Sequence, residues 1–330
     1  MPQPVNIRLI IKEQVEQLVT PVEVVDAVVD CFRALGDGKI VHPAKDPLWT
    51  NDAKTNMLLA MPAYRKDIGV AGVKWVSMYE DQKPGVPSSW GNLLILNDGE
   101  TGVPYAVMDA TAITTMRTAG GHAVAAARYL ARKNSKILAV VGCGEEGQAG
   151  IRSFLDNFPG LEELRLCDLN PDRIREVQER FGDRARVVPC ENARQAVEEA
   201  DIVLLVTTSR KPLVKAEWLP KGCFVAGLYA FHDLDPEVSR RADKWVLGNR
   251  TSDIHFVIED PLFADYHLRY EDVYADLGEI VTGCRPGREN DDEIILFSHM
   301  GMGSLDLTVG ELVYRRAVEK QIGTEFCMAR

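Results

Sequence analysis

Three glycines have the spacing of a site that holds a phosphate-containing dinucleotide. Gly142, Gly144 and Gly147 directly follow the apolar run KILAVV, and a helical pattern begins behind them. In a strand-to-helix turn of the form G-x-G-x-x-G, the first glycine allows a tight turn, the second lets a pyrophosphate approach, and the third lets helix and strand pack closely. The phosphates would then lie at a helix N-terminus, whose free N–H groups and dipole favour anions.

Asp168 ends the next strand-like run, ELRLCD, where a carboxylate can accept hydrogen bonds from the adenine ribose. An acid there repels a 2′-phosphate, so we expect NAD rather than NADP, although Arg173 is near enough in sequence to favour NADP. The alternative is that Asp168 only caps the helix that begins at Pro171. The sequence predicts this cofactor-binding set: Thr118, Gly142, Gly144, Glu145, Glu146, Gly147, Asp168, Thr207, Thr208, Ser209 and Ser304.

Two basic residues lie outside this nucleotide-binding pattern, in apolar surroundings. Lys74 lies within the strand-like run GVKWVS, and Arg117 lies near the start of an alanine-rich helical pattern in TTMRTAGG. Such residues usually reach the surface or pair with an acid. A guanidinium can also hold a carboxylate in bidentate fashion, and a lysine with a lowered pKa can exchange protons.

The elements that position Lys74 and Arg117 differ from those around the glycines. A helix is expected at Pro21–Leu35, with Thr20 as its cap and Gly36 as its stop, followed by strands and by a hairpin around the turn Gly99–Gly102. We expect this section to be antiparallel. The residues Thr111–Lys133 are expected to form a single helix that leads to the second domain.

From residue 135 the pattern alternates strands and helices, which predicts a Rossmann-type, doubly wound parallel sheet in an α/β protein. The expected division is a smaller α+β substrate-binding and dimerisation domain at residues 1–118 and an NAD-binding domain at 119–303. A C-terminal helix at 304–330 is expected to return to the first domain, and Ser304 is either a cofactor contact or the cap of that helix.

Composition excludes several classes of partner. A formal net charge of -11 disfavours nucleic acid and anionic membranes, because both require clustered basic residues. No run is long and apolar enough to span a bilayer, and the first residues lack the pattern of a signal peptide, so we expect a cytoplasmic protein. The seven cysteines are scattered singly without metal-ligand spacing, so we expect no metal.

Long segments of the chain resemble the ornithine cyclodeaminase and mu-crystallin family, most closely archaeal-type alanine dehydrogenases. The likeness runs through GVKWVS, TGVPYAVMDATAITTMRTAGGHAVAAARYLARKNS, VVGCG, SRKPLVKAEWLPKG, DVYADLGEIVTGCRPGRENDDEIILF and GMGSLDLTVGELVYRRA. The resemblance implies a homodimer and a small-molecule substrate. It also implies that Lys74 is the catalytic lysine, Arg117 the carboxylate-binding arginine, and Lys45 a further basic residue of the substrate site.

The chain departs from the family pattern in two places. Where cyclodeaminases carry a glutamate before a Met-Pro pair, this chain has Leu59 or Ala60. The family's loop with a catalytic aspartate is shorter here, which leaves His232 and Asp233 as candidates for the proton carrier. The alternative is that Asp233 is a helix-start acid and His232 an exposed loop residue.

These features predict an NAD-dependent oxidoreductase that interconverts an α-amino acid, or an N-substituted amino acid, with its 2-oxo or imino acid. The shortened loop suggests that the substrate is not simply alanine, and a pocket edge that includes Trp75, Trp90, Tyr229 and Phe231 would admit a larger or apolar substrate. One alternative is an ornithine cyclodeaminase, which uses NAD catalytically and releases ammonia. Another is a non-catalytic dinucleotide-binding protein of the mu-crystallin kind.

Overall fold

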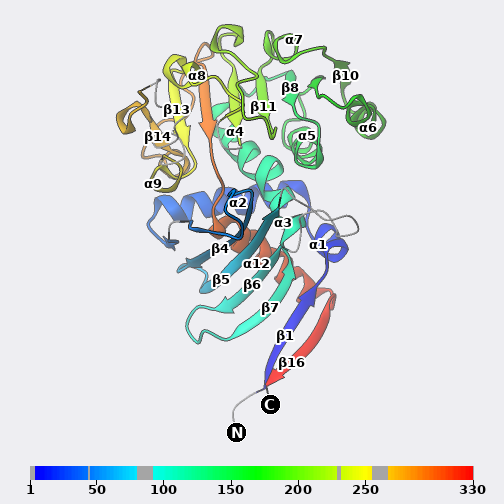
Figure 1. The fold of residues 1–330 in the computed structure, drawn as a ribbon, viewed down its shortest axis with the longest axis vertical. Coiled ribbons are helices and arrows are strands. Elements are labelled where there is room, and N and C mark those ends of the chain that lie inside the picture. The colour runs from blue at the N-terminus through cyan, green and yellow to red at the C-terminus, as the bar shows by residue number, and fades with distance from the viewer. Residues whose placement is uncertain (1–3, 44, 80–91, 229–231, 255–266, 330) are drawn as a thin grey trace. The chain divides into compact units, whose positions relative to one another are not determined.

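The computed structural model describes residues 4–43, 45–79, 92–228, 232–254 and 267–329. Three of the aromatic residues singled out from the sequence, Trp90, Tyr229 and Phe231, lie outside these ranges. The chain divides into two compact units (Figure 1). Unit 1 comprises Met1–Arg117 and Met302–Arg330, and unit 2 comprises Thr118–Gly301.

Unit 1 is built on one mixed sheet with the strand order β16-β1-β7-β6-β5-β4-β2, in which β3 pairs with β4. Its hairpin β6–β7 is antiparallel, as predicted, but β1 and β7 run parallel, so the expectation of a purely antiparallel section was wrong. The strands are β1 (Val5–Ile10), β2 (Ile40–Val41), β3 (Pro47–Trp49), β4 (Asn56–Arg65), β5 (Val70–Tyr79), β6 (Leu93–Asp98), β7 (Pro104–Asp109) and β16 (Thr324–Ala329).

Helices cover one face of this sheet, and α12 packs on β4, β5 and β6 (Figure 1). The predicted helix at Pro21 forms as α2, where Thr20 and Glu23 make a reciprocal capping box, which satisfies amide groups that the first turn leaves free. The helices of this unit are α1 (Lys12–Leu18), α2 (Pro21–Gly36), α3 (Ala110–Arg117) and α12 (Gly303–Glu319).

The C-terminal segment corrects the expected helix at 304–330. The helix α12 ends at Glu319, and residues 324–329 form β16, which pairs antiparallel with β1. Gln321, two residues after the helix, has a φ of +56°, the left-handed conformation that ends a helix, and Gly323, with a φ of +95°, adds a second left-handed residue before β16. The helical pattern in the sequence does not reveal this reversal, because pairing with β1 is a long-range contact.

Unit 2 contains a parallel sheet with the order β10-β9-β8-β11-β12-β15-β13-β14. This is a doubly wound sheet whose order reverses between β8 and β11, as the Rossmann prediction requires. The strands are β8 (Ile137–Val141), β9 (Glu163–Cys167), β10 (Arg186–Pro189), β11 (Ile202–Leu205), β12 (Phe224–Gly227), β13 (Lys244–Leu247), β14 (Ala275–Asp276) and β15 (Ile295–Ser298). The strands β14 and β15 were not anticipated.

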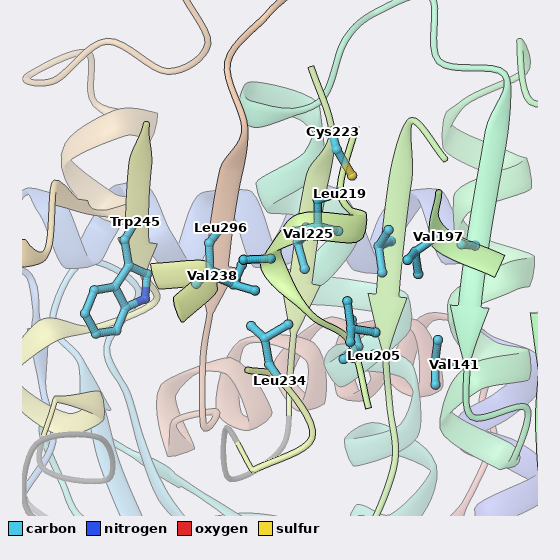
Figure 2. Close-up of a cluster of buried hydrophobic side chains, with 14 of the residues drawn as sticks. Val141, Val197, Leu205, Leu219, Cys223, Val225, Leu234, Val238, Trp245 and Leu296 are labelled. Carbon is cyan, nitrogen blue, oxygen red and sulfur yellow. The ribbon is translucent and has the colours of Figure 1, made fainter. Parts of the chain in front are cut away.

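Both sides of this sheet are buried, so its central strands are apolar at nearly every position. Figure 2 shows one core cluster, in which Val141, Leu205 and Val225 of neighbouring strands lie against apolar side chains from the connecting segments. In the described part of this unit, the helices are α4 (Val124–Leu130), α5 (Glu145–Asn157), α6 (Pro171–Phe181), α7 (Ala193–Val197), α8 (Glu237–Arg241), α9 (Arg250–Asp253) and α11 (Leu277–Val281), with 3-10 turns η2 (Ala216–Trp218) and η4 (Tyr270–Asp272).

The single helix expected at Thr111–Lys133 is interrupted. Between α3 and α4, residues Thr118–Ala123 form a π-helical segment, η1, and the helical path ends at Leu130. Segments of π-helix are rare and often occur at functional sites. This segment begins immediately after Arg117.

Candidate active site

A buried ionic cluster in unit 1 joins both basic residues singled out from the sequence. Asp306 Oδ1 accepts hydrogen bonds from Lys74 Nζ at 2.9 Å and from Arg117 Nε at 3.0 Å. Lys74 Nζ also donates to Thr114 Oγ1 at 3.2 Å. Lys74 is 2% exposed and Asp306 is 0% exposed, so two cations share one carboxylate in the core of this unit.

The electrostatics of this cluster make Lys74 unusual. Burial and the neighbouring Arg117 charge lower the pKa of Lys74 to about 8, and the Asp306 carboxylate only partly opposes them. The charge of Lys45 also lowers this pKa, so Lys45 is within electrostatic reach of Lys74. Burial would raise the pKa of Asp306, but Arg117 and Lys74 outweigh it, and the net shift is downward. Lys74 can therefore exchange a proton near neutral pH.

Three separate elements bring this cluster together. Lys74 lies on β5 between Met61 of β4 and Leu94 of β6, on the sheet face that α12 covers. Arg117 is the last residue of α3, and Asp306 lies in the first turn of α12. The apolar surroundings strengthen each charge interaction, because little water is present to screen it.

Sequence reasoning missed Asp306. The available signal was an acid on the apolar stripe of a helical pattern, since Asp306 shares its helix face with Val309 and Val313. A carboxylate on such a stripe requires a cationic partner, because an unpaired buried charge is costly. Both partners lie far away in sequence, so the pattern alone does not identify them.

The glycine-rich turn of unit 2 follows β8 and leads into α5, as predicted. Gly142 has a φ of +99°, and a Cβ there would lie 2.3 Å from Val206 O. A Cβ at Gly147 would lie 2.1 Å from Gly142 O, so this glycine permits the close packing of helix and strand. At Gly144 the nearest atom is Arg173 Nη1 at 3.5 Å, which leaves space for a ligand above the N-terminus of α5.

The Asp168 carboxylate lies beside this turn. Its Oδ2 accepts from Cys143 N at 2.6 Å, and its Oδ1 accepts from Asn170 N at 2.8 Å. The capping alternative for Asp168 is excluded, because Asn170 is the N-cap of α6 and accepts from Asp172 N. The next residue, Leu169, was not anticipated, and its apolar side chain is fully exposed.

Arg173 Nη1 lies 3.7 Å from Asp168 Oδ2, so the two oppositely charged groups are close together. The other predicted residues of the turn lie at the start of α5, where Glu145 is exposed and Glu146 Oε2 accepts from Ala119 N at 3.3 Å. Glu146 thereby ties η1, whose first residue is the half-buried Thr118, to the first turn of α5.

A second perturbed carboxyl lies behind the segment that follows β11. Asp233 Oδ2 accepts from Thr207 Oγ1 at 2.9 Å, while Ser209 N donates to Thr207 Oγ1 and Thr208 is exposed. Burial raises the pKa of Asp233 to about 6, because Asp233 is 1% exposed and its hydrogen bonds to Thr207 only partly offset the loss of water. His232 is half-buried, and its charge counteracts part of this rise in pKa.

Ser304 does not have the predicted capping role. Met302 is the N-cap of α12, and Ser304 is its second residue, fully buried beside the Cys31 thiol. The side chain therefore packs in the core of unit 1, which gives no support to a contact with a cofactor.

Among the described residues, no group of three or more His, Cys, Asp or Glu side chains has the geometry of a metal site. No helix in the described ranges is long and apolar enough to cross a membrane.

Comparisons with known proteins identify the family of the chain. The chain matches the model of the ornithine cyclodeaminase/mu-crystallin family over residues 7–321. It is 33% identical to an alanine dehydrogenase of Archaeoglobus fulgidus, over 96% of this chain and 97% of that protein. It is also 33% identical to an N-((2S)-2-amino-2-carboxyethyl)-L-glutamate dehydrogenase of Staphylococcus aureus, over 91% of each chain.

Solved structures show the same fold. The Thermococcus litoralis Δ1-pyrroline-2-carboxylate reductase, in complex with NADH and L-proline, matches with a TM-score of 0.87 and 31% identity, covering 96% of this chain and 99% of that chain. An archaeal alanine dehydrogenase dimer with bound NAD matches with a TM-score of 0.88 and 31% identity, covering 98% and 99%. These matches span both units of the chain, which therefore belongs to the ornithine cyclodeaminase/mu-crystallin family.

Proposed function

We propose that this protein is an NAD-dependent oxidoreductase that interconverts an α-amino acid, or an N-substituted amino acid, with its 2-oxo or imino acid. The observation that carries the proposal is the buried Lys74–Asp306–Arg117 cluster, in which a lysine with a pKa of about 8 lies beside a guanidinium. Relatives with named activities act on amino acids or cyclic imines, namely alanine and Δ1-pyrroline-2-carboxylate.

The glycine-rich turn fits a dinucleotide. We assign the pyrophosphate to the turn around Gly144, the adenine ribose to Asp168, and the adenine ring to the exposed side chain of Leu169. Thr207 and Ser209 follow β11 at the carboxyl edge, where the second half of the dinucleotide is expected. When bound, NADH supplies a hydride to the imine carbon, and NAD accepts one from the amino-acid Cα.

In unit 1, we assign the substrate carboxylate to Arg117 and Lys45 and proton exchange at the substrate nitrogen to Lys74. Asp306 holds the side chains of Lys74 and Arg117 in fixed orientations. A substrate bound to these two side chains would therefore have its Cα in a fixed position. This matters because hydride transfer requires the two reacting carbon atoms to approach to about 3 to 3.5 Å. The place of the cyclodeaminase glutamate is apolar, with Leu59 buried, so nothing there would bind a distal amine.

His232 and Asp233 are proposed as a second proton-carrying pair. The support is the raised pKa of Asp233, about 6, which suits proton exchange near neutrality. Among the described residues, Asp233 Oδ1 is buried without a hydrogen-bond partner, so this oxygen is available to accept one. The substitutions His232→Asn and Asp233→Asn should then each lower kcat about tenfold or more.

The test is a screen of NADH consumption with 2-oxo acids crossed with ammonia and small amines, and with cyclic imino acids. At least one combination should be reduced, and Lys74→Ala and Arg117→Ala should each lower kcat/KM at least about a hundredfold. Lys66→Ala, which removes an exposed lysine from the same unit, should leave kcat/KM unchanged.

Three results, from this screen and from parallel assays with ornithine and with NADPH, would overturn the proposal. Tight NADH binding without turnover of any compound would indicate a binding protein of the mu-crystallin kind. Conversion of ornithine into proline without net NADH formation would indicate a cyclodeaminase. A preference for NADPH that Arg173→Ala reverses would overturn the assignment of NAD.

We further propose that the protein is a homodimer and that the sheet of unit 1 forms the interface. The face of this sheet opposite Lys74 bears partly exposed apolar side chains, including Trp75 at 38% and Leu93 at 45% exposure. One continuous row crosses five strands through Pro62, Val73, Ile95, Val107 and Leu9. An apolar surface of this extent typically covers an interface, and an archaeal relative of 31% identity is a dimer.

Size-exclusion chromatography with light scattering tests the homodimer. The wild type should have twice the mass of the chain, and Ile95→Lys, in the middle of the row, should produce monomers. Val103→Lys, at an exposed valine outside the row, is the control and should remain dimeric. A monomeric wild type would disprove the proposal.

We also propose a cytoplasmic location, since all seven cysteines are free thiols, as is usual in a reducing compartment.

A further inference from the structure

Unit 2 contains a buried ionisable pair that the proposed chemistry does not use. His299 Nδ1 lies 2.6 Å from Asp253 Oδ2, and both side chains are fully buried. Asp253 is the last residue of α9, and His299 directly follows β15. Burying two ionisable groups is costly unless they bind each other well, so the pair is a specific feature of this fold.

The surrounding backbone holds Asp253 as a hydrogen-bond acceptor. Asn249 N donates to its Oδ2 at 3.0 Å, and Met300 N donates to its Oδ1 at 3.4 Å. Because both carboxylate oxygens of Asp253 act as acceptors, His299 Nδ1 carries a proton and donates it to Asp253 Oδ2. This hydrogen bond sets the orientation of the imidazole ring. The same carboxylate therefore fixes the His299 ring and the backbone of the next residue.

Gly248 provides the space for this ring. A Cβ at Gly248 would lie 2.1 Å from His299 Nδ1 and 2.2 Å from its Cγ. Real atoms do not approach so closely, so any other residue at 248 would displace the imidazole. Gly248 directly follows β13, the strand beside β15, and the pair thus occupies adjacent strand ends.

The ring of His299 also contacts η1. The ring centroids of His122 and His299 are 4.8 Å apart, in an edge-to-face arrangement at 70°. On its other side, η1 packs against α5, where Ser153 Oγ donates to Gly120 O. The pair is therefore connected through η1 to the helix whose N-terminus lies at the glycine-rich turn.

The position of the pair in the sheet indicates what it serves. In a doubly wound sheet, ligands bind at the carboxyl ends of the strands, and each half of the sheet takes one mononucleotide. Asp168 follows β9 in the first half, which takes the adenosine part, whereas His299 and Gly248 follow β15 and β13 in the second half. We propose that His299, with Asp253 and His122, positions the nicotinamide half of the dinucleotide by holding residues 299–301 and η1 in place.

This inference rests on the proposed function, and the test separates the two. Calorimetry would measure the Kd of NADH and of ADP-ribose, which lacks the nicotinamide, for each variant. His299→Ala should raise the Kd of NADH about tenfold, the effect expected from losing one buried charged hydrogen bond, and should change that of ADP-ribose less than about twofold. His299→Asn can still donate to Asp253 and should remain close to the wild type.

Gly248→Ala provides a second perturbation that leaves both members of the pair in place. It should weaken NADH binding like His299→Ala, and it should have little further effect in a His299→Ala background, where no ring remains to clash. His267→Asn, at an exposed histidine of the same unit, is the matched control. Unfolding temperatures would be measured in parallel.

Equal losses of NADH and ADP-ribose affinity in His299→Ala would reduce the pair to a structural role and overturn the inference. Unchanged NADH affinity in both His299→Ala and Gly248→Ala would overturn it as well. By contrast, a wild-type protein that binds neither ligand would refute the proposed function itself.

Discussion

The two sites of this molecule are constructed on different principles. The proposed dinucleotide site of unit 2 consists mainly of backbone, with three glycines within six residues and a single acid at the end of the next strand. The Lys74–Asp306–Arg117 cluster of unit 1 consists of charged side chains that three distant segments bring into the core. The first site depends on the absence of side chains, and the second depends on their exact pairing.

This difference determines how each site should respond to substitution. In a cluster of buried charges, removing one partner leaves the others uncompensated, so stability and activity fail together. In a backbone site, an added methyl group either clashes with protein or only occupies ligand space. In the latter case, stability and binding can be separated.

Removing Asp306 should have the largest effect. Asp306→Ala leaves Lys74 and Arg117 buried without their shared acceptor, and should lower the free energy of unfolding by about 3 kcal/mol or more. It should also lower kcat/KM at least about a hundredfold. Urea unfolding and steady-state kinetics would measure both changes, with Glu319→Gln, an exposed acid of the same helix, as control. A stable and active Asp306→Ala protein would contradict the importance of the cluster.

Two glycine substitutions should separate stability from binding in unit 2. Gly147→Ala forces α5 away from Gly142 O and should cost about 1 to 3 kcal/mol of folding free energy. Gly144→Ala meets only the flexible end of Arg173, so its unfolding temperature should not change, while the Kd of NADH should rise at least about tenfold. Thermal unfolding and calorimetry would measure these effects. Unaltered NADH binding in Gly144→Ala would exclude the pyrophosphate from this turn.

The pKa of Lys74 predicts a limb in the pH profile. With a pKa of about 8, neutral Lys74 accumulates above that pH, so kcat/KM for amino-acid oxidation should rise across it and kcat/KM for imine reduction should fall. Lys74→Arg should remove this limb, because a guanidinium stays charged. Initial rates from pH 6 to pH 10 would be compared with those of Lys66→Arg. Persistence of the limb in Lys74→Arg would assign it to another group.

Asp233 should affect stability in a way that depends on pH. Its folded pKa of about 6 lies above the ordinary value of 3.8, so between these values the folded protein binds more protons and loses stability as the pH rises. Asp233→Asn does not titrate and should be more stable than the wild type by about 3 kcal/mol at pH 7, but by much less at pH 4. Urea unfolding at each pH would be compared with Asp183→Asn, which removes an exposed acid. A pH-independent difference would exclude the shift.

Local patterns predicted the parts of the fold that local physics decides. The capping box at Thr20 and the parallel strands of unit 2 follow from short-range hydrogen bonds and continuous apolar runs. The same reasoning failed for η1 and β16. A π-helical turn shifts the helical repeat by a fraction of a turn, so the apolar pattern in the sequence still indicates a helix. The strand β16 forms because it pairs with β1, which lies at the other end of the chain.

The amino-acid sequence by itself determined the glycine-rich turn, because the conformations of Gly142, Gly144 and Gly147 depend on local geometry within one strand-turn-helix unit. Only the tertiary structure decided the partners of the buried ionisable groups, Asp306 for Lys74 and Asp253 for His299. An ion pair in a core is a long-range contact whose energy depends on distance and on exclusion of water, and neither quantity is encoded in the spacing of residues along the chain.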